Sequence, residues 1–217
     1  MPTLTETLAR RAVEKTSADR QARYAKEMGR IVEATYDYVE RTGNLEPSLR
    51  EILAHCALST QGFYRYFRSK DELMMVLLDD GRRQLVDYLV HRMEAESTPE
   101  GRIRTWIDGM LAQASNVRAA ARTRPFVANE DRISDLFPDE QQASVDQLID
   151  LLVEPITELA VRPAREREVR LDADAVYQLV FGILRAHLVR RTRPSPKETD
   201  HLIRFCLSGI GHTEEAG

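Results

Sequence analysis

Apolar residues recur along this chain at alternating intervals of three and four, the spacing that places them on one face of a helix. One such stripe consists of Tyr24, Met28, Ile31, Thr35 and Tyr38. No segment alternates apolar and polar residues as a half-buried strand does, and the Asp108-Gly109 pair lies within a helical pattern instead of a hairpin. The pattern therefore predicts an all-α protein of about nine helices.

Serines, glycines and prolines suggest where these helices begin and end. The expected helices span about residues 19–43, 48–55, 59–67, 69–96, 99–116, 117–136, 138–161, 172–192 and 195–211. Pro125 and Pro155 lie inside two of them and should kink or split them. We expect residues 1–18 to form a flexible basic arm and the charged residues 162–170 to form a solvated loop.

Residues 47–70 have the pattern of two short helices joined by a tight turn. Ser48 with Glu51 three residues later forms a capping-box pattern, and Ser59 is placed to cap the second short helix. A second helix in such a helix-turn-helix enters the major groove of DNA. The apolar residues expected to face the other helices are Ile52, Leu53, Leu58, Phe63 and Phe67.

Gln61 and Arg65 lie four residues apart and therefore share one face of this predicted helix. Glutamine can bind adenine through two hydrogen bonds, and arginine can bind guanine in the same way. We therefore predict that Gln61 and Arg65 read bases. The alternative is that both are ordinary solvated helix residues.

The segment Ser59 to Leu73, STQGFYRYFRSKDEL, resembles the signature of tetracycline-repressor-like (TetR family) regulators. Its aromatic pair and its Ser-Lys-x-x-Leu step match that signature in register, and the resemblance covers about residues 24–78. Ala57 departs from it, because the turn commonly carries glycine. The resemblance implies that Lys70 contacts phosphate. The full set of expected DNA contacts is Ser48, Arg50, Ser59, Thr60, Gln61, Gly62, Tyr64, Arg65, Tyr66 and Lys70.

The resemblance also implies how the rest of the chain is organised. After the arm, residues 19–68 would form a three-helix DNA-binding domain, and residues 69–217 a larger helical domain for ligand binding and dimerisation. A homodimer would bind a palindromic operator and be released by a small hydrophobic ligand. The residues expected to line the ligand pocket are Trp106, Met110, Gln113, Phe126, Tyr177 and His187. Those expected at the dimer interface are Val176, Leu179, Ile183, Leu202, Phe205 and Ile210.

The net charge of −4 is unusual for a DNA-binding protein, but the charge is unevenly distributed. Residues 1–70 carry 12 Lys and Arg against 9 Asp and Glu, whereas the remainder carries 19 against 26. This distribution suits a protein that meets phosphates at one end only.

Other classes of protein find little support in the sequence. We see no HExxH, CxxC, phosphate-loop or GxSxG motif, so we expect no catalytic site, no metal site and no cofactor. Cys56 and Cys206 are expected to be reduced, buried thiols. The sequence shows neither an export signal nor a membrane span, which suggests a cytoplasmic protein. Two alternatives remain: a helix-turn-helix regulator controlled by a protein partner, and a helical enzyme.

Overall fold

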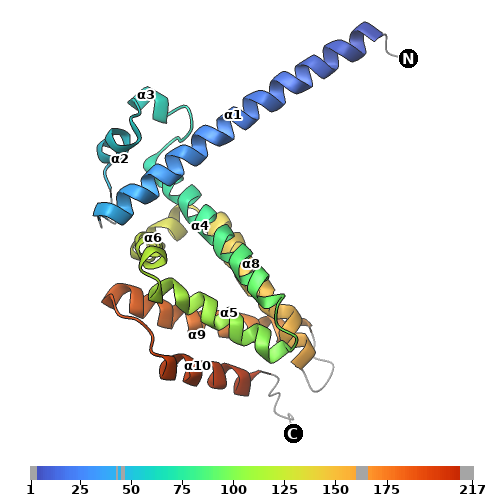
Figure 1. The fold of residues 1–217 in the computed structure, drawn as a ribbon, viewed down its shortest axis with the longest axis vertical. Coiled ribbons are helices and arrows are strands. Elements are labelled where there is room, and N and C mark those ends of the chain that lie inside the picture. Colours follow the sequence, from blue (N-terminus) through green and yellow to red (C-terminus); the bar gives the residue numbers. More distant parts are fainter. Residues whose placement is uncertain (1–3, 43, 45–46, 160–165, 211–217) are drawn as a thin grey trace. The chain divides into compact units, whose positions relative to one another are not determined.

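The computed structural model describes residues 4–42, 44, 47–159 and 166–210, and all regular structure within these residues is helical (Figure 1). The prediction of an all-α fold is confirmed. The helices are α1 (Leu4–Thr42), α2 (Leu49–Cys56), α3 (Thr60–Phe63), α4 (Lys70–Met93), α5 (Pro99–Ser115), α6 (Val117–Ala128), α7 (Glu130–Leu136), α8 (Pro138–Leu159), α9 (Glu166–Arg190) and α10 (Pro196–Gly209).

Two helices begin earlier than the sequence pattern indicated. Helix α1 starts at Leu4 and not near Asp19, so the segment expected to be a flexible arm is helical. Its Leu, Ala, Arg, Glu and Lys residues favour a helix intrinsically, even without an apolar stripe. Helix α9 starts at Glu166 and includes part of the expected loop, whose remaining residues up to 165 lie outside the described residues.

The early start of α9 has a physical explanation in its packing. Val169 is buried, and the Arg170 guanidinium pairs with Asp146 of α8 at 2.7 Å and also with Asp150. A charged segment that looked solvated in the sequence therefore forms the first turn of a packed helix.

Proline affects the two helices that contain it differently. The expected helix over 117–136 is divided into α6 and α7 at Asn129, four residues after Pro125. The Asn129 side chain donates to the carbonyl of Pro125 at 2.8 Å, which stabilises the break. Helix α8, in contrast, continues across Pro155. The split accounts for ten helices among the described residues instead of about nine.

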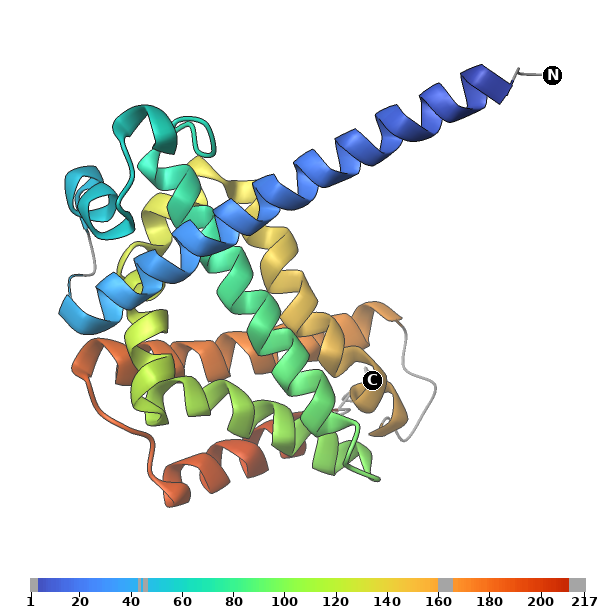
Figure 2. The same cartoon turned by 45° about the horizontal axis from the view of Figure 1, so that its top comes forward.

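The chain divides into two compact units, residues 1–73 and residues 74–217. The first, which we call the head unit, contains α1, α2, α3 and the start of α4. The two short helices follow one another through a tight connection (Figure 2). The boundary after Leu73 lies inside α4, slightly beyond the expected boundary at residue 68.

The head unit has a small core, and part of it was predicted. Ile52, Phe63 and Phe67 are fully buried, as the sequence indicated, together with Ile31 of α1. Leu53 and Leu58 are only half-buried. The Phe63 and Phe67 rings lie 5.3 Å apart, so the second short helix is anchored by aromatic contact as well as by burial.

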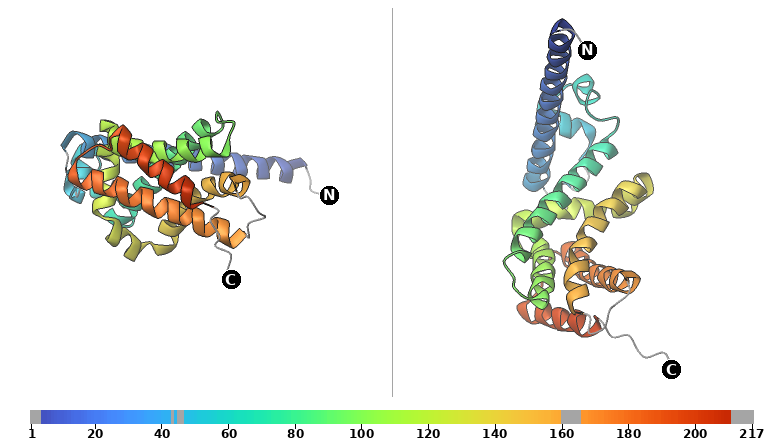
Figure 3. Two further views of the ribbon diagram at one scale, coloured as in Figure 1. Left: turned by 90° about the horizontal axis from the view of Figure 1, so that it is seen from below. Right: turned by 90° about the vertical axis from the view of Figure 1, so that its right-hand side faces the viewer.

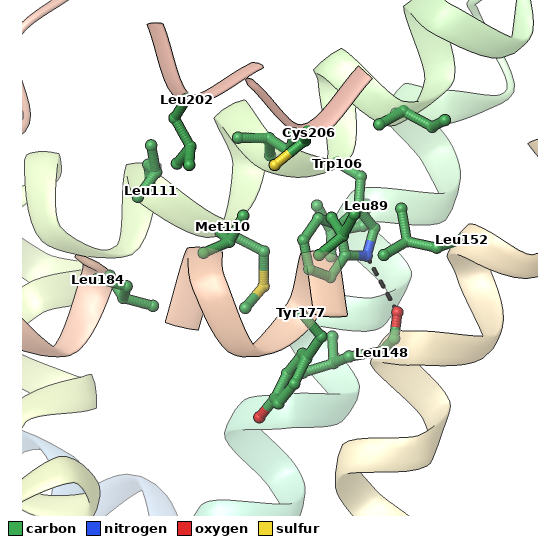
Figure 4. Close-up of a cluster of buried hydrophobic side chains, with 14 of the residues drawn as sticks. Leu89, Trp106, Met110, Leu111, Leu148, Leu152, Tyr177, Leu184, Leu202 and Cys206 are labelled. Carbon is green, nitrogen blue, oxygen red and sulfur yellow. Dashed lines mark hydrogen bonds between the residues drawn. The ribbon is translucent and has the colours of Figure 1, made fainter. Parts of the chain in front are cut away.

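The second unit, residues 74–217, which we call the body unit, has a continuous apolar core between α5, α8 and α9. Helix α10 lies beside α5 and α9 (Figure 3). Trp106 of α5 is completely buried, and its indole N–H donates to the carbonyl of Leu148 on α8 at 3.1 Å (Figure 4). Gly109 lets α4 and α5 approach closely, because a Cβ there would lie 2.4 Å from the Leu89 side chain.

Candidate nucleic-acid interface

Helix α2 is fixed by the capping box that the sequence predicted. The Ser48 hydroxyl accepts from the Glu51 N–H at 3.3 Å and donates to the Glu51 carboxylate at 2.6 Å, which also accepts from the Ser48 N–H at 2.7 Å. Tyr38 of α1 donates its hydroxyl to the same carboxylate at 2.7 Å. These hydrogen bonds, from Ser48 first, lower the pKa of Glu51 to about 2. The network thereby joins α2 to α1.

The turn of the motif is made by a non-glycine residue in a left-handed conformation. Ala57 has φ 53° and ψ 42°, and the N–H of Leu58 bonds to the carbonyl of Leu53 at 3.0 Å. This is the hydrogen bond of a Schellman motif, in which glycine is preferred. Ala57 is therefore in a strained backbone conformation. It is also the position at which the sequence departs from the family signature.

Helix α3 begins as predicted and ends earlier. The Ser59 hydroxyl accepts from the Gly62 N–H at 3.0 Å, so Ser59 is the N-cap. The helix ends at Phe63 instead of Phe67, and a turn follows in which the Tyr66 N–H bonds to the Phe63 carbonyl at 2.9 Å. Gly62 has a role in this cap, because a Cβ there would lie 3.2 Å from the Ser59 Oγ.

Tyr24 is a residue of this site that the sequence analysis assigned to an apolar stripe. Its side chain is 44% exposed, and its hydroxyl lies 3.3 Å from each of the carbonyl oxygens of Arg65 and Tyr66. Its ring centroid lies 4.9 Å from that of Tyr66. Tyr24 thus supports the backbone from which Arg65 projects, and Tyr66 has a packing partner as well as a predicted DNA contact. The spacing between residues 24 and 66 gives no sequence signal for this contact.

The predicted base readers Gln61 and Arg65 are both exposed, as are Thr60 and Tyr64, whose side chain is 54% exposed. Arg50 on α2 is exposed as well. These side chains are therefore accessible to a duplex. The Ser48 hydroxyl, in contrast, already donates and accepts within the capping box.

Lys70 is the first residue of α4, where backbone N–H groups and the helix dipole favour anions. The Ser69 hydroxyl caps this helix by accepting from the Glu72 N–H at 3.0 Å. The Glu72 carboxylate accepts from the backbone N–H of Arg68 and pairs with its guanidinium at 3.0 Å. These contacts, led by the Arg68 N–H, lower the pKa of Glu72. They fix the chain as it enters α4.

Of the six predicted pocket residues, four are buried and two are half-buried. Trp106 and Met110 are fully buried in the apolar core, and Phe126 and Tyr177 are nearly so. Gln113 is half-buried. Both ring nitrogens of His187 have partners at the α9–α10 connection: Thr192 Oγ1 at 2.8 Å and Glu198 Oε1 at 3.1 Å. The structure thus gives His187 a connecting role.

Two of the predicted dimer residues lie in the core of the body unit. Val176 and Leu202 are 5% and 4% exposed and pack inside the core of their own chain. Their contact with a second copy stays a prediction. Phe205 is 63% exposed and Leu179 is 36% exposed, while Ile183 and Ile210 are half-buried.

Neither a metal centre nor a membrane span is apparent in the described part of the chain. No cluster of His, Cys, Asp and Glu among these residues is arranged to hold a metal ion. No helix among them has the length and apolar character needed to cross a bilayer. Both cysteines are buried free thiols.

The capped short helices and the helical body define a helix-turn-helix DNA-binding protein. The sequence model described as "Bacterial regulatory proteins, tetR family" matches residues 31–75, which include α2, α3 and the start of α4. The resemblance seen in the sequence is thereby confirmed for residues 31–75, and this part of the chain is similar to TetR-family transcriptional regulators. A search of curated proteins finds no matching relative.

Solved structures show the same fold over most of the chain. NemR of E. coli in its reduced form has a TM-score of 0.64 at 16% identity, covering 87% of this chain and 100% of its own. A TetR regulator from Rhodococcus sp. RHA1 has a TM-score of 0.64 at 16% identity, with 89% and 100% covered. FadR from Bacillus subtilis in complex with stearoyl-CoA has a TM-score of 0.61 at 13% identity, with 83% and 98% covered.

Proposed function

We propose that this protein is a homodimeric repressor that binds a palindromic operator and is released by a small hydrophobic ligand. The observation that supports this most is the exposure of Gln61 on the capped helix α3 and of Arg65 in the turn that follows this helix. Base-reading side chains need such a rigid support, because small displacements break bidentate hydrogen bonds.

We assign base reading to Gln61 and Arg65, and backbone positioning to Thr60, Tyr64 and Lys70. Contacts with phosphate orient a protein on the duplex without reading its sequence. The other predicted DNA contacts stay predictions: Arg50, Ser59, Gly62 and Tyr66. Ser48 is also a predicted DNA contact, in addition to capping α2.

Dimerisation is supported by an exposed apolar stripe along α9. Leu171, Leu179 and Val189 are 60%, 36% and 67% exposed, and the small exposed residues Ala175 and Gly182 lie between them at helical spacing. On α10, Phe205 is equally exposed. Exposed apolar stripes of this kind are typical of protein interfaces. A twofold dimer would present two recognition helices to the two halves of a palindrome.

Ligand control is supported by the similarity of the body unit to FadR, which was solved with stearoyl-CoA. Among the expected pocket residues, Gln113 is half-buried, while Phe126 and Tyr177 are 9% and 4% exposed. Trp106 and Met110 are better explained as core residues.

The DNA-binding proposal is tested by titrating the purified protein onto a random-sequence DNA library and onto the palindrome that the library selects. We expect a preference of about 10³-fold or more for one palindrome and a steep fall in affinity with salt. Equal affinity for all sequences at physiological salt would contradict a regulator.

The dimer proposal is tested by light scattering on Phe205→Glu, with Val117→Glu as the matched control. Phe205 and Val117 are similarly exposed, at 63% and 70%, but Val117 lies on α6, outside the proposed interface. We expect only Phe205→Glu to shift the protein toward monomer, because it buries a charge in the interface. A dimer that tolerates Phe205→Glu would place the interface elsewhere.

A further inference from the structure

A half-buried arginine lies inside the body unit without a carboxylate partner. Arg82 of α4 donates from Nη1 to the side-chain oxygen of Gln141 at 2.9 Å and to its backbone carbonyl at 3.4 Å. Gln141 is itself buried at the start of α8. Burial lowers the pKa of the Arg82 guanidinium, yet arginine stays charged in proteins. The hydrogen bonds that the structure shows for this desolvated positive charge are thus to neutral groups, while the carboxylates of Glu130 and Asp79 act on it only from a distance.

The carboxylates near Arg82 are already engaged by other arginines. Asp79 pairs with Arg83 at 2.5 Å, and Glu130 pairs with Arg185 at 3.0 Å. Among the described residues no ion pair of Arg82 is found. Arg82 is thus the half-buried guanidinium of this neighbourhood, and in the described part of the chain it has hydrogen bonds to Gln141 but no ion pair. Such a charge favours an anion that can reach it.

A hydroxyl donor belongs to the same neighbourhood. Burial raises the pKa of Tyr177 to about 12. The positive charge of Arg82 lowers this pKa and the negative charge of Glu130 raises it, so both groups lie close enough to act on the hydroxyl. The Tyr177 hydroxyl is therefore protonated near neutral pH and can donate a hydrogen bond. Its ring is stacked on Phe181 with centroids 5.6 Å apart. Figure 4 shows the hydroxyl pointing away from Trp106 and the apolar cluster.

We propose that the body unit binds an amphipathic organic oxyanion, a carboxylate or a phosphate ester, with its head group on Arg82 and the Tyr177 hydroxyl. Its apolar part would lie against the adjoining aromatic residues of α9. Guanidinium groups bind carboxylate and phosphate through paired, charge-assisted hydrogen bonds. The proposal rests on the proposed ligand-controlled function and adds the chemical class of the ligand.

Thermal unfolding of the full-length protein tests this with three probes of equal chain length: decanoate, decyl phosphate and decanol. We expect one or both anions to raise the Tm of the wild type and decanol to have little effect. Arg82→Gln should reduce anion affinity by about tenfold or more, because it removes a charge-assisted hydrogen bond to the head group. Arg92→Gln is the matched control, since Arg92 is exposed near the other end of the same helix. It should bind as the wild type does.

A second variant keeps the test decisive if Arg82→Gln does not fold. Tyr177→Phe retains the stacked ring and removes only the hydroxyl, so it should weaken anion binding by up to about tenfold without changing the response to decanol. Equal stabilisation by decanol and the anions, or full anion binding by either variant, would overturn the proposal. So would the absence of any anion effect on the wild type.

Operator binding separates this inference from the proposed function. Ligand-free Arg82→Gln should bind the selected palindrome with wild-type affinity, because Arg82 lies in the body unit. A wild type that binds the palindrome but not the anions refutes the oxyanion proposal alone. A wild type that binds the anions but prefers no DNA sequence refutes the operator proposal and leaves the oxyanion site standing.

Discussion

In the head unit, the short helices α2 and α3 are each started by a serine hydroxyl, and polar networks such as Tyr38–Glu51 join them to α1. In the body unit, long helices are held by an apolar core around Trp106, and polar contacts are mostly peripheral. The difference teaches where each function is encoded. The proposed DNA recognition would depend on local capping geometry that exposes a few side chains, whereas the proposed ligand control would depend on packing between distant segments.

The largest effect expected from this contrast concerns the body core. Trp106→Ala should lower the free energy of unfolding by about 3–5 kcal/mol, because it leaves a cavity among α5, α8 and α9. Trp106→Phe should cost less, since it keeps a ring but loses the hydrogen bond to Leu148. Urea unfolding followed by circular dichroism measures both. A loss below ~1 kcal/mol for Trp106→Ala would show that the core does not depend on this residue.

A smaller effect is expected at the turn of the head unit. Ala57→Gly should raise the free energy of unfolding by about 0.5–1 kcal/mol, because glycine adopts φ 53° without strain. Ala54→Gly is the matched control in the middle of α2, where glycine should instead cost about 1 kcal/mol. Thermal unfolding of the two variants should therefore move in opposite directions. Movement in the same direction would argue against strain at Ala57.

A third effect concerns Glu51 and is measured by its dependence on pH. Hydrogen bonds from Ser48 lower the pKa of Glu51 to about 2, below its ordinary value of 4.5. The stabilising contribution of the carboxylate is therefore complete above pH 4.5 and is lost as pH falls toward 2. The stability difference between the wild type and Glu51→Gln should shrink over this range. Asp37→Asn, an exposed change on α1, is the control. A difference that is constant with pH would contradict the network.

The same contrast explains what could be predicted from the sequence. Helix caps act over three residues, so Ser48, Glu51 and Ser59 could be assigned correctly from spacing alone. Helical periodicity led us to expect Gln61 and Arg65 to be exposed, and both are, although α3 ends at Phe63 and Arg65 lies in the turn after it.

Contacts between distant segments have no such local signal. Three such contacts depend on tertiary packing. Tyr24 supports the backbone of Arg65 and Tyr66, Arg170 pairs with α8, and Val176 packs in the core. The early starts of α1 and α9 were missed because both segments are polar. Intrinsic helix propensity favours a helix at the start of α1, and the ion pairs of Arg170 and the buried Val169 hold the start of α9.

The most direct test of the account is the affinity of wild type, Arg65→Ala and Lys70→Ala for the selected palindrome and for single-base variants of it, at several salt concentrations. We predict that Arg65→Ala loses about 1–3 kcal/mol of discrimination at one base position in each half-site. Lys70→Ala should weaken binding to all sequences alike and reduce the salt slope by about 1. A specificity ratio unchanged by Arg65→Ala would contradict base reading by this face.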